Sequence, residues 1–295
     1  MPELPEVTTF IENIKKEVMN KIITNVVVYN PKVLKNANQV YFTNFFKDEI
    51  IHDIQRKGKY IIFYLSHDKS FVLHLRMEGK IIFHHPEDKL LNNHNLVTWI
   101  FADHNELRYY DTRMFGTMHV YDGDAKLQDK SLKKVGLEPF DDNFNATYLM
   151  QAMKTHTKKA LKTLLLDQSI IAGIGNIYAD EILYACKLNP TCTIKDLNKS
   201  DYENLVKYTI KILKTAIDNK GTTIASYVND SKNHTGNYQN YLKVHQQKDK
   251  KCVRCLSKIK KTVVNGRGTY YCETCQGKIK NNNLNKKHQK KKIRA

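Results

Sequence analysis

The chain has 295 residues, of which 41% are hydrophobic, so it is long enough for two domains with separate cores or one large domain. Its formal net charge is +18, from 48 Lys and Arg against 30 Asp and Glu, which predicts a polyanionic partner such as DNA, RNA or an anionic membrane. No run of about 18 apolar residues occurs, and the start lacks an apolar stretch, so we expect neither a membrane span nor a signal peptide. A cytoplasmic protein is therefore expected, and structural disulfides are rare in that compartment.

The first part of the chain, residues 1–130, contains many short β-type runs separated by Gly, Asn and Asp. A helix is expected first, over residues 8–19, because its apolar residues recur with helical spacing. The strands are expected at residues 24–29, 59–65, 71–75, 80–84, 96–101, 107–111 and 117–121. Evenly spaced short strands favour a β-sandwich or a flattened barrel.

The pattern changes near Gly136, and the apolar spacing is helical from residue 145 to about residue 220. We expect helical segments around residues 161–168, 177–183 and 202–218. Residues 221–247 are polar and irregular, and we expect a loop of this length in a compact domain to be functional or mobile. The end of the chain, residues 278–295, is rich in Lys and Asn and has little to bury, so we expect disorder there.

Four cysteines follow the spacing of a structural zinc site, in which two Cys-x2-Cys pairs are separated by 16 residues. They are Cys252, Cys255, Cys272 and Cys275. Asn265-Gly266 lies between the pairs and predicts a β-hairpin turn, with Arg267 near its tip. Such a hairpin suits insertion into a nucleic-acid groove. Cys186 and Cys192 stand apart and are expected to be small buried apolar residues.

The chain opens with the sequence Met-Pro-Glu-Leu-Pro-Glu-Val. An initiator Met before a small residue is usually removed, and here that would leave Pro2 with a secondary α-amine. The reference pKa of an α-amine is about 7.7–8.0, against about 10.4 for lysine, so much of it is the free base near neutral pH. Such an amine can form a Schiff base with an aldehyde-level carbon, and Glu3 beside it could act as general acid.

Six motifs occur in one order along the chain: the opening segment, Arg56-Lys57-Gly58-Lys59-Tyr60, His74-Leu75-Arg76-Met77-Glu78-Gly79, Asp111-Thr112-Arg113-Met114-Phe115-Gly116, Gly173-Ile174-Gly175-Asn176-Ile177-Tyr178-Ala179-Asp180-Glu181, and the cysteine hairpin. Together they resemble the bacterial formamidopyrimidine-DNA glycosylase family, also called 8-oxoguanine DNA glycosylases. The likeness extends over about residues 2–278.

The resemblance implies an α+β fold and a bifunctional repair enzyme for double-stranded DNA that carries oxidised purines or abasic sites. Its expected parts are a β-sandwich catalytic domain (2–132), a helix-two-turns-helix domain with a lesion-capping loop (133–247), a four-cysteine zinc finger with one structural zinc (248–278) and a basic tail (279–295). DNA would lie between the first two parts, with the damaged nucleotide flipped out of the stack. A monomer is expected.

The resemblance also assigns roles to individual residues. Pro2 would attack C1′ of the lesion, Glu3 would supply the proton for the departing base, and Lys59 and Arg267 would donate protons in the β- and δ-eliminations. Met77, Arg113 and Phe115 correspond to residues that fill the void left by the flipped base. The expected phosphate contacts are His94, Lys158, Lys162 and Asn176, and the sequence leaves open which of the two lysines contacts DNA. The expected lesion contacts are Glu6, Glu78, Thr222, Thr223, Ile224 and Tyr241, and Glu6 is expected to order the N-terminus.

The sequence departs from the family pattern at Leu96, where a second histidine is common, and in its longer basic tail. The related endonuclease VIII family, which acts on oxidised pyrimidines, is a weaker match because it usually has Gly where Leu4 stands and lacks the segment at residues 74–79. A non-enzymatic zinc protein that binds DNA is disfavoured by the presence of Pro2, Glu3 and Lys59. An RNA-binding protein associated with ribosomes is supported by the net charge alone.

Overall fold

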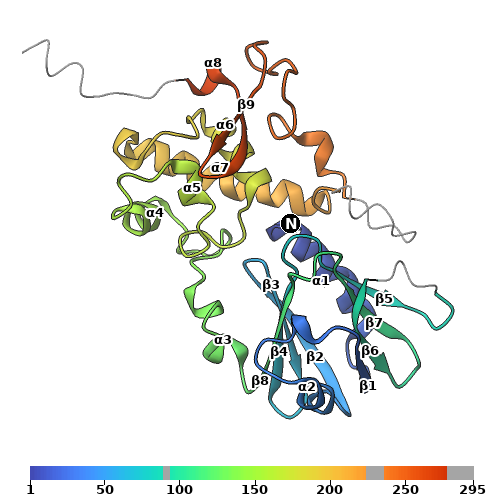
Figure 1. Cartoon of the computed structure of the whole chain (residues 1–295). Coiled ribbons are helices and arrows are strands. Elements are labelled where there is room, and N and C mark those ends of the chain that lie inside the picture. Colours follow the sequence, from blue (N-terminus) through green and yellow to red (C-terminus); the bar gives the residue numbers. More distant parts are fainter. Residues whose placement is uncertain (89–93, 224–235, 278–295) are drawn as a thin grey trace, which may run out of the picture. The chain divides into compact units, whose positions relative to one another are not determined.

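The computed structural model describes residues 1–88, 94–223 and 236–277. The chain divides into two compact units. Unit 1 comprises Met1–Val135 and Lys214–Asn240, and unit 2 comprises Gly136–Leu213 and the chain from Tyr241 onward. Figure 1 shows the helices and strands of both units.

Unit 1 begins with helix α1 (Leu4–Val18), which starts four residues earlier than the sequence pattern predicted. Glu3 has extended backbone angles and serves as the N-cap residue, and Pro5 occupies the first turn, where its missing N–H costs no helical hydrogen bond. Val7, Ile11 and Ile14 form the buried stripe of this helix. Because α1 starts directly after Glu3, the first residues of the chain are held in the fold.

The eight strands of unit 1 form one antiparallel sheet in the order β5-β7-β6-β1-β2-β3-β4-β8. Their bounds are β1 (Ile22–Val28), β2 (Glu49–Lys57), β3 (Tyr60–Leu65), β4 (Lys69–His74), β5 (Lys80–His84), β6 (Asn95–Phe101), β7 (Glu106–Tyr110) and β8 (Thr117–Asp122). The rings of Phe71 in β4 and Trp99 in β6 stack 5.5 Å apart, although these strands are not neighbours in the sheet. The sheet therefore folds over on itself into two facing layers, which confirms the expected β-sandwich (Figure 1).

The apolar side chains of both layers and of α1 belong to one core. Helix α1 packs against β2 and β5, so the start of the chain is fixed to the sandwich. Strand β2 and helix α2 (Gln39–Phe45) were not predicted from the sequence. The pattern of β2 is obscured by its charged residues, and one of these, Glu49, is buried because it pairs with Lys69 of β4.

The remaining short elements of unit 1 are η1 (Pro31–Val33), α3 (Ala125–Gln128) and η2 (Leu132–Lys134). Those of unit 2 are α4 (Ala146–Met153), α5 (Leu161–Leu165), α6 (Asn176–Cys186), η3 (Ile194–Asp196), β9 (Lys260–Val264), β10 (Arg267–Tyr271) and α8 (Glu273–Gln276). Helix α7 (Lys199–Asp218) belongs to unit 2 up to Leu213 and to unit 1 from Lys214, and η5 (Tyr238–Tyr241) follows later in the chain. The helical character predicted for this region is confirmed.

Helix α6 is central to unit 2, since it packs against α5, β10 and α8. Gly175 is its N-cap, and Lys187 ends it in the left-handed conformation with φ of 58°. The hairpin β9–β10 turns at Asn265 and Gly266, whose φ angles of 47° and 73° are those of a type I′ turn, as the sequence predicted. No helix within the described residues is both long enough and apolar enough to cross a membrane.

Candidate active site and nucleic-acid interface

The first three residues of the chain lie in a buried, charged environment within unit 1. Pro2 is buried, and the Glu3 side chain is only 2% exposed. Burial lowers the pKa of the Met1 amine below its usual value; the carboxylates of Glu3, Glu6 and Glu78 act in the opposite direction, and the ammonium group of Lys59 acts in the same direction as burial. An amine at this point of the chain is thereby favoured as the free base, which is the nucleophilic form.

Lys59 is positioned by the tight turn between β2 and β3. Gly58, with φ of 59°, and Lys59 form the two-residue loop that closes the pair Lys57–Tyr60. Arg56 donates to the carbonyl of Gly58 at 3.1 Å and to Thr8 Oγ1 of α1 at 3.1 Å, so it ties this turn to the first helix. The Lys59 residue is 5% exposed, so it is not a solvated surface lysine.

Glu6 connects the start of the chain to the stem of the loop that follows α7. Its Oε2 accepts a hydrogen bond from the Glu3 backbone N–H at 2.9 Å. Its Oε1 accepts from the backbone N–H of Thr222 at 2.8 Å and from Thr222 Oγ1 at 3.0 Å. Contacts at both carboxylate oxygens therefore support the expectation that Glu6 orders the N-terminus.

The two ends of this loop are joined by hydrogen bonds. Thr223 Oγ1 donates to the carbonyl of Gly236 at 2.6 Å, and the N–H of Tyr238 donates to the carbonyl of Gly221 at 3.0 Å. Gly221 has a φ of 72°, and a Cβ there would lie 2.7 Å from Glu6 Oε1, so only glycine allows this close approach. Ile224, an expected lesion contact, lies outside the described residues.

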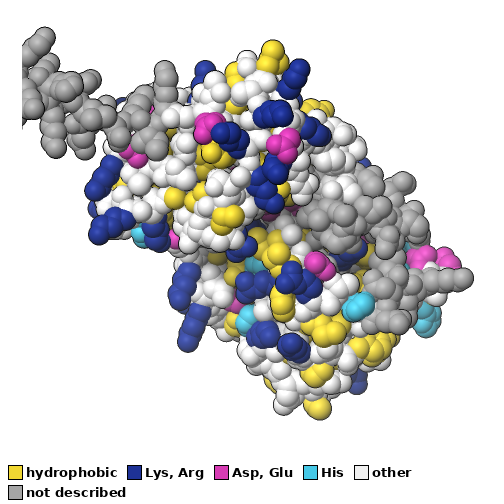
Figure 2. All heavy atoms as spheres, turned by 45° about the horizontal axis from the view of Figure 1, so that its top comes forward, with side chains coloured by type: hydrophobic (Ala, Val, Ile, Leu, Met, Phe, Trp, Pro, Cys, Tyr) yellow, Lys and Arg dark blue, Asp and Glu magenta, His cyan; other side chains and the backbone are white. Residues whose placement is uncertain are grey.

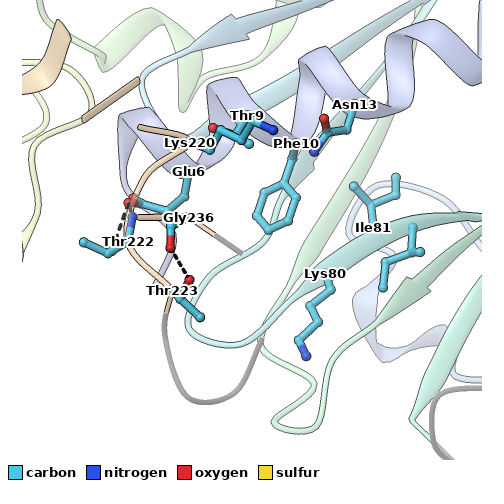
Figure 3. A pocket seen from close by; sticks show the side chains of 11 residues that line it. Glu6, Thr9, Phe10, Asn13, Lys80, Ile81, Lys220, Thr222, Thr223 and Gly236 are labelled. Carbon is cyan, nitrogen blue, oxygen red and sulfur yellow. Dashed lines mark hydrogen bonds between the residues drawn. The ribbon is translucent and has the colours of Figure 1, made fainter. Parts of the chain in front are cut away.

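A small pocket, partly open to solvent, lies beside this loop stem. Glu6, Thr222 and Thr223 line one side, and Phe10 of α1 and Lys80 of β5 point into the same space (Figure 3). The pocket thus combines an aromatic ring with polar groups, a composition typical of sites that bind small organic groups. Three of the expected lesion contacts line it.

The expected void-filling residues come from two loops of unit 1. Met77 lies between β4 and β5, and Arg113 and Phe115 lie between β7 and β8. Phe115 is 49% exposed, so it does not pack in the core. The Arg113 guanidinium lies 4.7 Å from the centre of the Phe115 ring. Glu78 accepts a hydrogen bond from Thr112, so the two loops also contact each other.

In unit 2 the structure corrects the expectation that Lys162 contacts DNA phosphate. The Lys162 side chain is fully buried, and its ammonium group lies 2.7 Å from Asp180 Oδ1. It also donates to the carbonyl of Gly268 at 3.0 Å and to Thr269 Oγ1 at 2.8 Å. A buried lysine neutralised in this way has a structural role. Lys158, in contrast, is exposed.

Asn176 and Arg267 are linked through the hairpin. Asn176 opens α6 after Gly173, which has φ of 84°, and its side-chain amide donates to the carbonyl of Gly268 at 2.9 Å. Arg267 precedes Gly268 and is exposed at the hairpin tip. The N-terminus of α6 presents backbone N–H groups that favour an anion. The side chains of α5 and α6 therefore fix the backbone next to the exposed arginine.

The four cysteines of the predicted zinc site come together in unit 2. Their sulfur atoms all lie within 4.8 Å of one another, and the Cys252–Cys275 and Cys255–Cys272 sulfurs are 3.8 and 3.4 Å apart. Four sulfurs at about 2.3 Å from one zinc ion are separated by roughly 3.8 Å, so the set fits tetrahedral zinc with no open position. The hydroxyl of Tyr184, on α6, lies 3.2 Å from Cys252 Sγ, which anchors the zinc site to that helix.

The other predicted residues are placed as follows. His94 is half-buried and directly precedes β6, and Tyr241 of η5 is 46% exposed in unit 2. Cys192 is buried, as expected, and Cys186 is half-buried. Lys and Arg side chains are spread over the visible surfaces of both units, with fewer Asp and Glu among them (Figure 2).

Several residues that build the site were not assigned roles from the sequence. Arg56, Asp111 and Asp180 all lie in the motifs quoted above, yet a motif does not show which of its members face inward. Asp180 forms an ion pair with Lys162 through Oδ1, and its Oδ2 accepts from His245 at 2.8 Å and from the N–H of Tyr270 at 3.2 Å. The signal available was a charged residue among apolar ones in a helix, which indicates a buried partner.

Three family models match successive parts of the chain. Residues 1–118 match the formamidopyrimidine-DNA glycosylase N-terminal domain, residues 135–228 match the formamidopyrimidine-DNA glycosylase H2TH domain, and residues 249–277 match the zinc finger found in FPG and IleRS. The chain is 46% identical over 277 residues to the formamidopyrimidine-DNA glycosylase of Mycoplasma genitalium, covering 94% of this chain and 96% of that protein. It is 42% identical over 277 residues to that of Shouchella clausii, covering 94% and 99%.

Solved structures of complexes with damaged DNA are also similar. A Lactococcus lactis FPG mutant bound to Fapy-dG-containing DNA has a TM-score of 0.87, 34% identity, and coverage of 94% of this chain and 100% of that one. A Lactococcus lactis Fpg complex with DNA containing an abasic site has a TM-score of 0.85 with the same identity and coverage.

Proposed function

Because this chain belongs to the formamidopyrimidine-DNA glycosylase family, and is therefore a DNA glycosylase of base-excision repair with one structural zinc, we propose that Pro2 is its nucleophile. The observation that carries the proposal is the buried start of the chain, where the terminal amine has a lowered pKa beside Glu3 and Lys59. In the proposed reaction Met1 is removed first, and the secondary amine of Pro2 then attacks C1′ of the damaged nucleotide.

Attack by Pro2 forms a bond between its nitrogen and C1′, and the bond from C1′ to the base breaks with its electron pair on the base. Glu3 gives the departing base a proton, which general acid catalysis requires. The C1′–O4′ bond then breaks, O4′ takes up a proton, and the C1′–nitrogen bond becomes a Schiff base that acidifies the proton on C2′. Loss of the C2′ proton expels the 3′ phosphate, and loss of a second proton, from C4′, expels the 5′ phosphate. Lys59 and Arg267 are the proposed proton donors for these steps.

We propose oxidised purines in double-stranded DNA, together with abasic sites, as the substrates. The similar structures contain DNA with Fapy-dG and with an abasic site, which supports this range. The proposed lesion contacts are Glu6, Glu78, Thr222, Thr223, Ile224 and Tyr241. The pocket that Glu6, Thr222 and Thr223 line supports the proposal for these three residues. His94, Lys158 and Asn176 are the proposed phosphate contacts, and Met77, Arg113 and Phe115 the proposed void-filling residues.

The organisation of the molecule is proposed on the same basis: a catalytic part at residues 2–132, a DNA-binding helical part at 133–247, a zinc finger at 248–278 and a basic tail at 279–295. The unit boundaries differ from this scheme because residues 214–240, including the loop stem, belong to unit 1. We further propose that the protein acts as a monomer in the cytoplasm.

The test is trapping with borohydride. A duplex with 8-oxoguanine opposite cytosine should give a covalent protein–DNA adduct with the mature chain, and a variant with one extra residue before Pro2 should give none. Glu3→Gln should lose base excision by about 100-fold or more but still be trapped on abasic DNA, because its amine is intact. Glu12→Gln, an exposed position on the same helix, is the matched control and should behave like the wild type.

An absence of adduct and of strand nicking with all lesion duplexes would reject the mechanism. A parallel duplex with oxidised thymine separates oxidised purines from oxidised pyrimidines. Preferential cleavage of the thymine lesion would reject the proposed substrate class and leave the Pro2 chemistry in place.

A further inference from the structure

The two loops that carry the proposed void-filling residues surround one buried hydroxyl group. Residues 75–79 connect β4 to β5, and residues 111–116 connect β7 to β8. Tyr109, near the end of β7, is fully buried, and its hydroxyl lies where both loops pass. A Cβ on Gly116 would lie 1.7 Å from this oxygen, and a Cβ on Gly79 would lie 2.8 Å from it. Only glycine at these two points lets both loops pack around the tyrosine.

Asp111 organises the second loop through its carboxylate, and its residue is 1% exposed. Oδ1 accepts a hydrogen bond from the N–H of Arg113 at 3.0 Å. Oδ2 accepts from the N–H of Phe115 at 2.9 Å, from the N–H of Gly116 at 2.8 Å and from the Tyr109 hydroxyl at 3.1 Å. Both oxygens are therefore used to hold the backbone of the residues that carry Arg113 and Phe115.

The shape of this loop decides which side chains are presented outward. Met114 adopts a φ of 55° and packs against the core of the sandwich, where Asn30 Nδ2 lies 3.1 Å from its sulfur. With Met114 anchored inward, its neighbours Arg113 and Phe115 are exposed and stack on each other. The loop is thus fixed before any DNA arrives, and a fixed loop loses less conformational entropy on binding.

We propose that Tyr109 and Asp111 are a pair of positioning residues that hold Met77, Arg113 and Phe115 ready to enter the gap left by a flipped nucleotide. This inference rests on the proposed function, because it takes those three side chains as the void-filling set. The pair touches neither the lesion nor the reacting atoms. Substitution of either residue should therefore lower activity only on substrates in which a flipped nucleotide leaves a gap in the base stack.

Asp111→Asn tests the carboxylate with almost no change in volume. An amide has one acceptor oxygen, so its NH2 group must face either the Arg113 N–H or the three donors at the other oxygen, where donor meets donor. Tyr109→Phe removes only the hydroxyl and leaves the ring that fills the space beside Gly79 and Gly116. Asp103→Asn is the matched control, because Asp103 also accepts a backbone N–H in a turn next to β7, from Asn105 at 3.2 Å, but away from the two loops.

Each protein is assayed on three substrates: duplex 8-oxoguanine opposite cytosine, duplex 8-oxoguanine opposite adenine, and a single-stranded oligonucleotide with one abasic site. Asp111→Asn should lower kcat/KM on the cytosine duplex by about 100-fold, since small misplacements of positioning groups have effects of this size. Tyr109→Phe should lower it by about fivefold, the effect of one lost hydrogen bond. Nicking of the single strand, which has no stack and no orphaned base, should stay within about twofold of wild type for both.

A role in positioning Arg113 also predicts a change in opposite-base selectivity. The ratio of the rates on the cytosine and adenine duplexes should move toward one in Asp111→Asn. The double variant with Arg113→Ala should show the same ratio as Arg113→Ala alone, since coupled residues are not additive. General loss of folding would lower all three activities together and leave the ratio unchanged.

The outcomes distinguish failure of the proposed function from failure of the positioning role. If the wild-type protein cleaves none of the substrates, the proposed function fails. If the wild type cleaves them but both variants match Asp103→Asn on the duplexes, the positioning role is overturned. It is also overturned if both variants lose single-strand nicking as much as they lose duplex cleavage. If Asp111→Asn does not fold, the Tyr109→Phe comparison alone decides, with a loss confined to duplex substrates as the supporting result.

Discussion

Lys162 and Asp180 form a fully buried ion pair, with 2.7 Å between the ammonium nitrogen and the carboxylate oxygen. The same lysine donates to the carbonyl of Gly268, the residue that follows Arg267 at the hairpin tip. A lysine that the family resemblance offered as a candidate DNA contact thus holds the β-hairpin against α5 and α6. This pair and three other groups of contacts can each be tested by a single change to the protein.

Lys162→Met should lower the free energy of unfolding by about 3–5 kcal/mol, because it leaves the Asp180 carboxylate buried without its main partner. Lys159→Met is the matched control: Lys159 is 45% exposed, its nitrogen lies 3.8 Å from Asp167, and its loss should cost less than about 1 kcal/mol. Urea denaturation of the two variants measures the difference. If Lys162→Met and Lys159→Met had the same free energy of unfolding, the buried pair would not stabilise unit 2.

Removal of zinc should abolish binding to abasic-site DNA by releasing the hairpin that carries Arg267. Cys272→Ser and chelator treatment should both give protein without zinc, since a site of four thiolates that loses one of them loses most of its affinity. Cys186→Ala, outside the metal site, should keep its zinc. Metal analysis and fluorescence anisotropy with labelled DNA provide the measurements. Unchanged DNA affinity in the zinc-free protein would contradict the prediction.

His74 should make the protein less stable as the pH falls. Burial lowers its pKa to about 3, the charges of Arg76 and Lys59 act in the same direction, and its Nδ1 accepts the N–H of Arg76 at 3.0 Å in the neutral form. In the unfolded chain the histidine takes up a proton below about pH 6.5, but the folded chain does so only near pH 3. The free energy of unfolding should therefore fall by about 1.4 kcal/mol per pH unit between these values from this group alone.

The measurement for His74 is the pH dependence of urea denaturation for wild type and His74→Gln between about pH 7 and about pH 4. Above about pH 6.5 the difference between the two proteins should be constant, and below it the wild type should lose stability more steeply. Parallel curves over the whole range would show that the buried histidine is not responsible for the loss in acid.

Glu6→Gln should weaken the connection between the loop stem and the N-terminus. A glutamine has one acceptor oxygen, so it cannot accept from both Glu3 and Thr222 without placing its NH2 group against a donor. Excision of 8-oxoguanine in single turnovers should fall by about tenfold, the effect of a lost charge-assisted hydrogen bond. Glu17→Gln, at an exposed position of α1, is the control and should have no effect. A wild-type rate in Glu6→Gln would rule out this coupling.

The features that depend on neighbouring residues could be predicted from the sequence. The Cys-x2-Cys pairs predicted the zinc site, and Asn265-Gly266 predicted the hairpin turn that places Arg267 at its tip. The helical spacing of apolar residues predicted most of α7, and the order of the motifs indicated the family. Turn chemistry, chelate spacing and helical periodicity are all local, so a linear pattern carries them.

The features that depend on pairing between distant residues became visible only in the folded chain. Strand β2 was missed because its charged residues hide the alternation, and its pairing with β1 and β3 establishes it as a strand. Lys162 was a candidate phosphate contact from the family resemblance, and only the fold brings Asp180 against it. In the same way, the Tyr109 hydroxyl meets Asp111, Gly79 and Gly116 only after the sheet has formed. The free energy of a buried charge or hydroxyl depends on the partner that the fold provides, and that partner is not marked in the sequence.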